Sequence, residues 1–550
     1  MTGSVGIVGA GTMGAGIAQI AAVAGRKVLI ADAVPGAAAR AVDAIRDRVK
    51  TQVARGRLTV DPDALDLTAL ADPVGLAGCA VVIEAIIEDL AVKQALFAEL
   101  EAVVADDTIL ASNTSSLSPT ALAAGLAHPE RLVGLHFFNP VPAMKLVEVI
   151  SGLATAPEVA DAAADLATAW GKTVVRSTAT PGFIVNRIAR PFYAEAWRLY
   201  EEHATVAQNI DAVLTGAGGF RMGPFALMDL IGHDVNEAVT RSVWAAFGYD
   251  PRFAPALAQR ALVEAGWLGR KSGRGMYPAD GAPAPAPAPA APPPHAVTEH
   301  AVTGLVPPVG DAAPVGDAAP AGEREREPSP LRVLLDRAGV AIVAGDRDGA
   351  VSGGPVSGDT ARLPGGLVEL PSGALLTLSE GTTATALAAA FGRPVIVADR
   401  FLDPATATAA AIAPSDGCPP AAVTEAVGLL QAAGLDVYVI DDVPGLIVTR
   451  TVAMLANLAA DALAGRVASE PDIDAAMRLG VNYPLGPLAW ARRWGTGTVL
   501  RILDNLEDWY RDGHYRPSPL LRRAALAERG LAARESLLPS PGHSGREEGQ

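Results

Sequence analysis

An internal repeat is the feature of this sequence that most constrains its fold. Residues 171–188, GKTVVRSTATPGFIVNRI, align without gaps with residues 434–451, GLDVYVIDDVPGLIVTRT. The same offset brings further positions into register, namely Ile210-Asp211-Ala212 with Ile473-Asp474-Ala475, and Gly223-Pro224 with Gly486-Pro487. A match held over roughly sixty positions predicts that one structural unit occurs twice in the chain.

Changes in hydrophobic pattern and composition divide the chain into segments. Short β-branched runs such as KVLIAD alternate with helical patterns at first, which predicts an α/β domain with a doubly wound, mostly parallel sheet. A helical region and the stretch ADGAPAPAPAPAAPPP then predict an all-α domain and an extended spacer. The expected segments are the α/β domain 1–180, the helical domain 181–278, the spacer 279–330, a degenerate α/β segment 331–440, a second helical copy 441–533, and a disordered tail 534–550.

The bulk composition excludes several classes of protein. A chain of 550 residues with 50% apolar and 19% charged residues is typical of a multidomain globular protein. Its net charge of −16 argues against nucleic acid or an anionic membrane as a partner, since both select a basic surface. Cys79 and Cys418 have no Cys or His neighbour at ligand spacing, so we expect neither a disulfide scaffold nor a metal site. No stretch is typical of a signal peptide or a membrane span, and a cytoplasmic location is expected.

A glycine-rich motif near the N-terminus predicts a nucleotide site. In VGIVGAGTMGAGIAQIAA, Gly9, Gly11 and Gly14 follow a strand and open a helix in the spacing G-x-G-x-x-G. Asp32 ends the next strand, where a carboxylate binds the adenosine ribose and repels a 2′-phosphate. The motif and the acid together predict a Rossmann domain that binds NAD. The other loop residues expected at the cofactor are Ala10, Thr12 and Met13.

Two ionisable residues, His136 and Glu148, interrupt the apolar stretch LVGLHFFNPVPAMKLVEVI. Such groups are costly to bury unless they are paired, so they form either a satisfied structural pair or a catalytic one. Ser115 and Asn186 are expected near the same edge of the sheet, where α/β folds bind ligands. Beside a nicotinamide cofactor the catalytic interpretation is favoured, because oxidation of an alcohol needs a base and histidine suits that role.

Five longer motifs extend this interpretation: GAGTMGAGIAQ, SNTSSL, GLHFFNPVP, TPGFIVNR and GRKSGRGMY. With these motifs the chain resembles the L-3-hydroxyacyl-CoA dehydrogenases over residues 1–278. The resemblance implies NAD-dependent oxidation of a 3-hydroxyacyl-CoA, with His136 as the base and Glu148 as its partner. It also implies that Ser115 and Asn186 hydrogen-bond the C3 oxygen and the thioester end of the substrate.

Further ligand contacts are expected from the same resemblance. The positions implied at the NAD site are Glu88, Lys93, Asn113, Ser115, Asn139 and Lys271. The phosphates of coenzyme A need cations, and RDRVKTQVARGR offers Arg46, Lys50 and Arg57 on one helix face if the helix stays regular. The alternative is a solvated basic surface.

The repeated helical segment narrows the resemblance to the longer 3-hydroxyacyl-CoA dehydrogenases of phenylacetate catabolism, which oxidise 3-hydroxyadipyl-CoA. That substrate carries a distal carboxylate, and Arg221 in GGFRMGPF is its expected partner; an ordinary surface arginine is the alternative. Two rival functions stay open. One is a 3-hydroxybutyryl-CoA dehydrogenase, and the other is a dinucleotide-binding sensor or scaffold without turnover.

The second copy of the repeat lacks the expected chemistry. Asn186 corresponds to Thr449, and neither a His–Glu pair nor a G-x-G-x-x-G motif occurs in 331–440. We therefore expect a non-catalytic copy. Since the helical domains of the resembling family dimerise, the two copies are expected to form an intrachain pseudo-dimer, with a homo-oligomer as the alternative.

Overall fold

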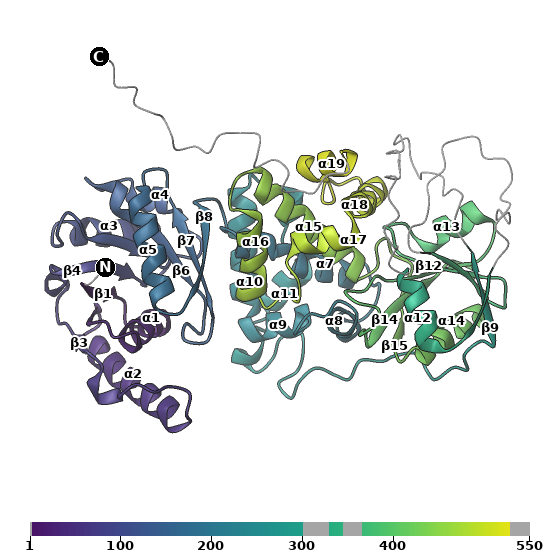
Figure 1. Cartoon of the computed structure of the whole chain (residues 1–550), viewed down its shortest axis with the longest axis horizontal. Helices are drawn as coiled ribbons and strands as arrows, with labels where there is room; N and C mark the ends of the chain where they lie inside the picture. The colour runs from purple at the N-terminus through teal and green to yellow at the C-terminus, as the bar shows by residue number, and fades with distance from the viewer. Residues whose placement is uncertain (1–2, 301–328, 345–365, 528–550) are drawn as a thin grey trace, which may run out of the picture.

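The computed structural model of the chain describes residues 3–300, 329–344 and 366–527. Two α/β units lie at opposite ends of the long axis, and helices from both halves lie between them (Figure 1). The predicted tail 534–550 and most of the predicted spacer lie outside the described residues.

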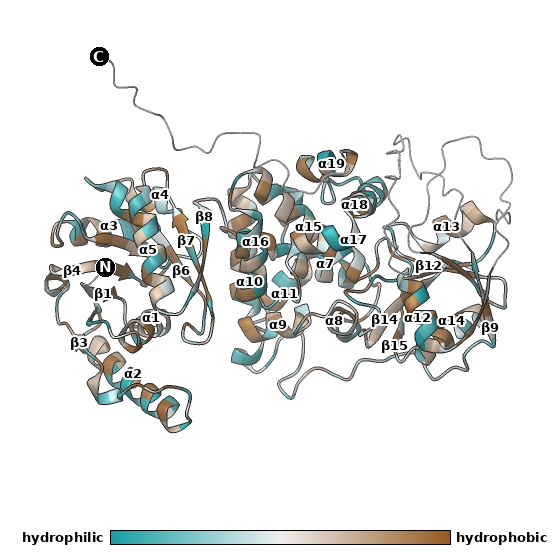
Figure 2. Cartoon of the chain, in the orientation of Figure 1, coloured by the Kyte–Doolittle hydropathy of each residue, from teal (hydrophilic) through white to brown (hydrophobic). Residues whose placement is uncertain are grey.

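The first α/β unit is built on an eight-stranded sheet in the order β3-β2-β1-β4-β5-β6-β7-β8. All neighbouring strands are parallel except β6 and β7, which pair antiparallel. Short apolar runs form these strands, and in Figure 2 they are mainly brown. The strands are β1 (Ser4–Val8), β2 (Val28–Ala31), β3 (Leu67–Ala69), β4 (Cys79–Glu84), β5 (Ile109–Ser112), β6 (Leu132–Phe137), β7 (Leu146–Ser151) and β8 (Thr173–Thr178).

Helices cover both faces of this sheet, as predicted for a doubly wound fold. Separate apolar cores lie on the two faces; one includes Ile17 and Ile45, and the other includes Phe97 and Leu122. The helices are α1 (Thr12–Val23), α2 (Ala37–Ala54), α3 (Leu90–Glu101), α4 (Pro119–Ala123) and α5 (Pro157–Ala169).

Two helical domains follow the two α/β units. The first contains α6 (Val185–Ile188), α7 (Arg190–Glu201), α8 (Ala207–Gly216), α9 (Pro224–Ile231), α10 (His233–Ala246) and α11 (Leu257–Glu264). The second contains α15 (Val448–Ala464), α16 (Glu470–Gly480), α17 (Pro487–Trp494), α18 (Thr496–Tyr510) and α19 (Pro519–Leu526). Helix α15 packs against α7, so the two copies dock on each other within one chain.

The second α/β unit has a seven-stranded mixed sheet in the order β10-β9-β11-β12-β13-β14-β15. Its strands are β9 (Ala296–His300), β10 (Ala341–Ala344), β11 (Leu367–Glu369), β12 (Leu375–Leu378), β13 (Val395–Ala398), β14 (Ala409–Pro414) and β15 (Asp436–Val439). Its helices are α12 (Pro330–Ala338), α13 (Ala384–Phe391) and α14 (Pro420–Ala432).

The spacer predicted at 279–330 differs from a free linker. Strand β9 lies inside it and pairs with both β10 and β11. The Ala/Pro-rich segment before β9 is also attached to this unit, because the Ala288 N–H donates to the Val437 carbonyl and the Ala291 N–H donates to Gln431. This strand, AVTEH, was not predicted because the residues around it are rich in proline.

The repeat extends into the sheets at the same sequence offset. Strands β13, β14 and β15 begin at the positions that correspond to β6, β7 and β8, and β13 pairs antiparallel with β14 as β6 does with β7. Helices α14, α15 and α17 likewise correspond to α5, the α6–α7 segment and α9. The second half is thus a degenerate copy of the first, as predicted.

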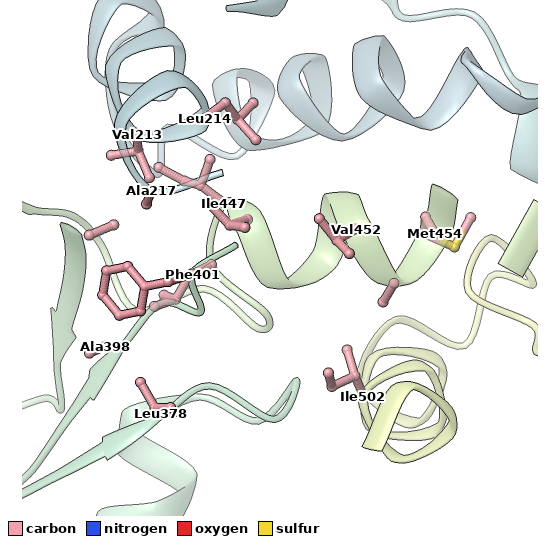
Figure 3. Close-up of a cluster of buried hydrophobic side chains, with 14 of the residues drawn as sticks. Val213, Leu214, Ala217, Leu378, Ala398, Phe401, Ile447, Val452, Met454 and Ile502 are labelled. Atoms are coloured by element: carbon pink, nitrogen blue, oxygen red, sulfur yellow. The ribbon is translucent and has the colours of Figure 1, made fainter. Parts of the chain in front are cut away.

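Each helical domain also touches the α/β unit of the other half. Helix α8 packs against β14, and α16 packs against β7 and β8. One continuous apolar core joins the helices of both halves to the second sheet. Figure 3 shows Val213 and Leu214 of α8, with Ala217 just after it, close to Ile447 and Phe401 of the second half.

Buried polar contacts also cross between the halves. Nε2 of His514 lies 2.6 Å from the carboxylate of Glu195, and its Nδ1 lies 3.1 Å from the Pro251 carbonyl. Both partners of the ring nitrogens are acceptor oxygens. The hydroxyl of Tyr515 donates to the other oxygen of Glu195 at 2.8 Å. Burial raises the pKa of Glu195, but the charge of His514 outweighs it and holds that pKa below its ordinary value.

We predict that Gly480→Leu weakens the docking of the second half on the first α/β unit. A Cβ at Gly480 would already lie 2.8 Å from Leu146 and 3.0 Å from Val185, so a larger side chain overpacks the contact by about 1–3 kcal/mol. Thermal unfolding should show a lower midpoint. The matched control is Gly497→Leu, where a Cβ meets no atom within 4 Å; an equal loss in both variants would contradict the prediction.

Candidate active site

The glycine-rich loop joins β1 to α1. Gly9 has a φ of +105°, and a Cβ at Gly14 would lie 1.8 Å from the Gly9 carbonyl oxygen, so both positions require glycine. At Gly11, by contrast, a Cβ would meet nothing within 4 Å. The backbone at the N-terminus of α1 is therefore open to a ligand, and the loop fits a pyrophosphate.

Asp32 follows β2 and faces the glycine-rich loop. Its two carboxylate oxygens accept hydrogen bonds from the Ala10 N–H at 2.7 Å and the Val34 N–H at 2.8 Å. These bonds fix the carboxylate beside the loop, where it would receive the ribose hydroxyls of a dinucleotide.

A buried charge cluster lies at the ends of β4 and β5. Lys93 is 1% exposed and its ammonium is paired with Glu84 and, at 3.3 Å, with Glu88. Glu88 accepts hydrogen bonds from the Thr114 hydroxyl and the Ser115 N–H. Burial raises the pKa of Glu88, but the bond from Thr114 and the charge of Lys93 outweigh it and hold that pKa below its ordinary value. In this arrangement Lys93 positions Glu88 and the loop that carries Ser115.

The structure brings three of the predicted polar residues to one sheet edge. Asn113 accepts a hydrogen bond from the Phe137 N–H at 2.9 Å, which ties the end of β5 to the end of β6. The amide of Asn186, at the start of the helical domain, donates to the Ser115 carbonyl at 3.4 Å. Ser115 and Asn186 are both only partly buried, so their side chains are available to a ligand.

His136 and Glu148 face each other across the antiparallel pair β6–β7. Nδ1 of His136 lies 2.6 Å from Oε2 of Glu148, and both side chains are buried. The other oxygen of Glu148 accepts hydrogen bonds from the Ile184 and Val185 N–H groups, both at 3.0 Å. The carboxylate therefore fixes the ring and the start of the helical domain at once.

Nε2 of His136 has no hydrogen-bond partner among the described residues. The rings of Phe138 and Phe183 flank the imidazole at centroid distances of 4.4 and 5.8 Å. An imidazole held through Nδ1 by a carboxylate and free at Nε2 can accept a proton there and share the positive charge with its partner.

The second half has different residues at the positions equivalent to the His–Glu pair. His136 corresponds to Asp399, and Glu148 corresponds to Ala411. Asp399 accepts hydrogen bonds from the N–H groups of Ile447, Val448 and Thr449 at 2.6–2.9 Å. One aspartate thus caps α15 as Glu148 caps α6, without a base, and the second copy lacks the pair as predicted.

The predicted coenzyme A cations do not share one helical face. Helix α2 ends at Ala54 and Gly56 has a φ of +67°, so Arg57 lies beyond the helix. Arg46 donates to the carbonyls of Pro62, Asp63 and Leu65, and Lys50 pairs with Asp63 at 3.1 Å. The assumption of a regular helix was wrong, because the helix ends three residues before Arg57 and Gly56 then turns the chain.

Two other predicted residues, Asn139 and Lys271, lie on the surface. Asn139 is exposed in the β6–β7 connection, which Lys172 holds through the carbonyls of Val141 and Met144; burial lowers the pKa of Lys172 to about 8. Lys271 pairs with Asp234 at 2.6 Å.

Arg221 is exposed in the α8–α9 loop. That loop is bound to the second α/β unit through the Ala217 carbonyl, which accepts from the Leu402 N–H at 2.9 Å. This hydrogen bond connects the loop to the second half.

The comparison with known families follows this division of the chain. Residues 4–180 match the NAD binding domain of 3-hydroxyacyl-CoA dehydrogenase, and the C-terminal domain of the same enzyme matches twice, over 182–279 and 445–535. The chain belongs to the 3-hydroxyacyl-CoA dehydrogenase family. Residues 376–444 match a third description, the 3-hydroxybutyryl-CoA dehydrogenase reduced Rossmann-fold domain. The predicted family, NAD cofactor and repeated helical domain are confirmed.

Individual relatives carry two different substrate names. The 3-hydroxyadipyl-CoA dehydrogenase of Escherichia coli K12 is 44% identical over 530 residues, which cover 96% of this chain and 98% of that protein. The probable 3-hydroxybutyryl-CoA dehydrogenase of Bacillus subtilis is 40% identical and covers 49% of this chain. The crystal structure of 3-hydroxybutyryl-CoA dehydrogenase from E. coli matches with a TM-score of 0.79 and 43% identity over 96% of this chain and 99% of that one. The predicted oxidoreductase class is confirmed.

The described residues contain neither a metal-type cluster of side chains nor a membrane-type helix. No group of three or more His, Cys, Asp or Glu side chains there is arranged to hold a metal ion. No helix in the same part of the chain is long and apolar enough to cross a membrane.

Sequence reasoning missed Glu84, which anchors the charge cluster. Its carboxylate accepts hydrogen bonds from the Ser112 hydroxyl and the Ile86 N–H, both at 2.7 Å, in addition to its pairing with Lys93. A signal was present, because Glu84 ends the apolar run AVVIE in the same way that Glu148 interrupts LVEVI.

We predict that Glu148→Gln lowers kcat by about 10²–10⁴-fold, because a neutral amide cannot stabilise an imidazolium at His136. Binding of NADH, followed by its fluorescence, should stay close to that of the unchanged protein. Glu99→Gln on the exposed side of α3 is the matched control. Equal turnover in the two variants would show that the His–Glu pair is structural.

We predict that Asp399→Ala, in contrast to Glu148→Gln, lowers stability and leaves turnover unchanged. The substitution removes the cap of α15 and should lower the free energy of unfolding by about 1–3 kcal/mol, while turnover per folded molecule stays unchanged. Chemical denaturation and an activity assay on the same sample measure both quantities. A large loss of turnover without a loss of stability would assign a catalytic role to the second half.

Proposed function

We propose that the chain oxidises (S)-3-hydroxyadipyl-CoA to 3-oxoadipyl-CoA with NAD as the hydride acceptor, as a step of phenylacetate catabolism in the cytoplasm. The observation that carries this substrate is the full-length relative named 3-hydroxyadipyl-CoA dehydrogenase, which shares both halves of the chain.

His136 is the base of the proposed reaction. Its Nε2 takes the proton of the 3-hydroxyl group, and Glu148 holds Nδ1 and stabilises the imidazolium that forms. The Ser115 hydroxyl and the Asn186 amide orient the oxygen and the thioester. When bound, NAD supplies the acceptor for the hydride that leaves C3.

The glycine-rich loop and Asp32 would hold the pyrophosphate and the ribose of NAD, and Glu88, Asn113, Asn139 and Lys271 are the further proposed contacts. Lys93 contributes by fixing Glu88. Arg46, Lys50 and Arg57 are the proposed surface for the phosphates of coenzyme A. The docked helical domains support a single chain as the working unit, and homo-oligomer formation stays a prediction.

Short-chain 3-hydroxybutyryl-CoA is the second candidate substrate, because the E. coli structure and the family description of residues 376–444 carry that name. A sensor or scaffold without turnover is less favoured, since such a protein has no use for a buried base held at Nδ1 and free at Nε2.

We predict NADH formation with both (S)-3-hydroxyadipyl-CoA and (S)-3-hydroxybutyryl-CoA, with a higher kcat/KM for the adipyl thioester. His136→Ala should lower kcat by at least about 10²-fold, since general base catalysis contributes this much or more, and should leave NADH binding intact. A preference for the butyryl thioester would replace the substrate and keep the reaction. No oxidation of either thioester would favour the scaffold.

A further inference from the structure

Arg190 is a buried cation without an anionic partner. It is 5% exposed, and its guanidinium donates to the Asn186 carbonyl at 2.9 Å and the Thr240 hydroxyl at 3.0 Å. It also lies 5.0 Å from the centre of the Tyr193 ring. Among the described residues no carboxylate forms an ion pair with it.

The other buried arginines differ from Arg190 in this respect. Each has a carboxylate as an ion-pair partner or as a charge neighbour: Arg131 has Glu101, Arg187 and Arg252 have Asp250 and Asp461, Arg400 has Glu380, and Arg450 has Glu202. Burying a charged side chain is costly unless the charge is paired. The unpaired guanidinium of Arg190 therefore favours the binding of an anion.

The position of Arg190 relates this site to the substrate. It opens α7, four residues after Asn186, and residues at this spacing share one side of a helix. The hydrogen bond from Arg190 to the Asn186 carbonyl places the guanidinium beside the residue proposed to orient the thioester.

Two tyrosines complete the environment of Arg190, and one comes from the second half of the chain. Burial lowers the pKa of Arg190, and the neighbouring hydroxyls of Tyr193 and Tyr483 oppose that effect. The hydroxyl of Tyr483 is buried and has no hydrogen-bond partner. Tyr483 follows α16, whose end at Gly480 packs on Leu146 and Val185. A guanidinium and hydroxyl groups that can donate form an environment that favours a carboxylate.

We propose that Arg190, with Tyr193 and Tyr483, binds the distal carboxylate of a dicarboxylic acyl-CoA and sets the preference for it over a methyl-terminated chain. The inference rests on the proposed function, whose substrate class it explains. It replaces Arg221 as the partner of that carboxylate. A methyl-terminated substrate would leave the guanidinium unpaired in a desolvated site, which is a strong basis for rejection.

The test compares kcat/KM for (S)-3-hydroxyadipyl-CoA and (S)-3-hydroxyhexanoyl-CoA, two six-carbon thioesters that differ in carboxylate against methyl. Arg190→Met should lower kcat/KM for the adipyl thioester by about 10²–10³-fold and keep or raise it for the hexanoyl thioester. Arg241→Met, at an exposed arginine of α10, is the matched control and should keep the preference of the unchanged protein.

Tyr483→Phe provides a second variant that does not depend on how well Arg190→Met folds. It removes an oxygen without a protein partner, so stability should not fall, and the preference for the adipyl thioester should drop about three- to tenfold. An unchanged preference in both variants, or a loss in Arg221→Met alone, would overturn the role of Arg190. Failure of the unchanged protein to prefer the adipyl thioester would instead overturn the proposed function, and this inference with it.

Discussion

The rest of the structure depends on one kind of contact, a buried carboxylate that caps the first helical segment of each helical domain. Glu148 accepts the N–H groups of Ile184 and Val185 with one oxygen, and it still has the other for His136. In the second half, Asp399 accepts backbone N–H groups and the Thr449 hydroxyl, and it has no histidine partner. In both halves a carboxylate accepts the free N–H groups at the start of a helix. Only the half with the longer acid, Glu148, also carries the base.

This arrangement explains why the catalytic half and the helical domains are coupled. A shift of α6 would move Glu148, and the ring of His136 would follow because its Nδ1 is held at 2.6 Å. Helix α16 of the second half packs on β7, the strand that carries Glu148. The degenerate half therefore packs against the strand that positions the catalytic pair. The loop after α16 also brings Tyr483 toward Arg190.

The sequence identified candidate site residues where an ionisable side chain interrupts an apolar run. Glu148 and His136 were recognisable because ionisable side chains are rare in buried strands, and the glycine-rich loop because its spacing follows from backbone geometry. The helix continuation to Arg57 failed, since one glycine at positive φ ends the pattern. Strand β9 was missed in a Pro-rich context. Arg190 gave no signal, because an arginine on a helix is unremarkable until its lack of a carboxylate is seen in three dimensions.

The fusion of both copies in one chain has a consequence for the axis between them. Phe220 and Tyr483 occupy corresponding positions and touch there, with ring centroids 5.1 Å apart; Pro251 and His514 do the same through a hydrogen bond. In a symmetric dimer each of these contacts would join two copies of one residue, and every change would appear twice. Covalent linkage removes that duplication, so each side of the axis was free to diverge. It also makes the association of the two halves independent of protein concentration, because neither can diffuse away on dilution.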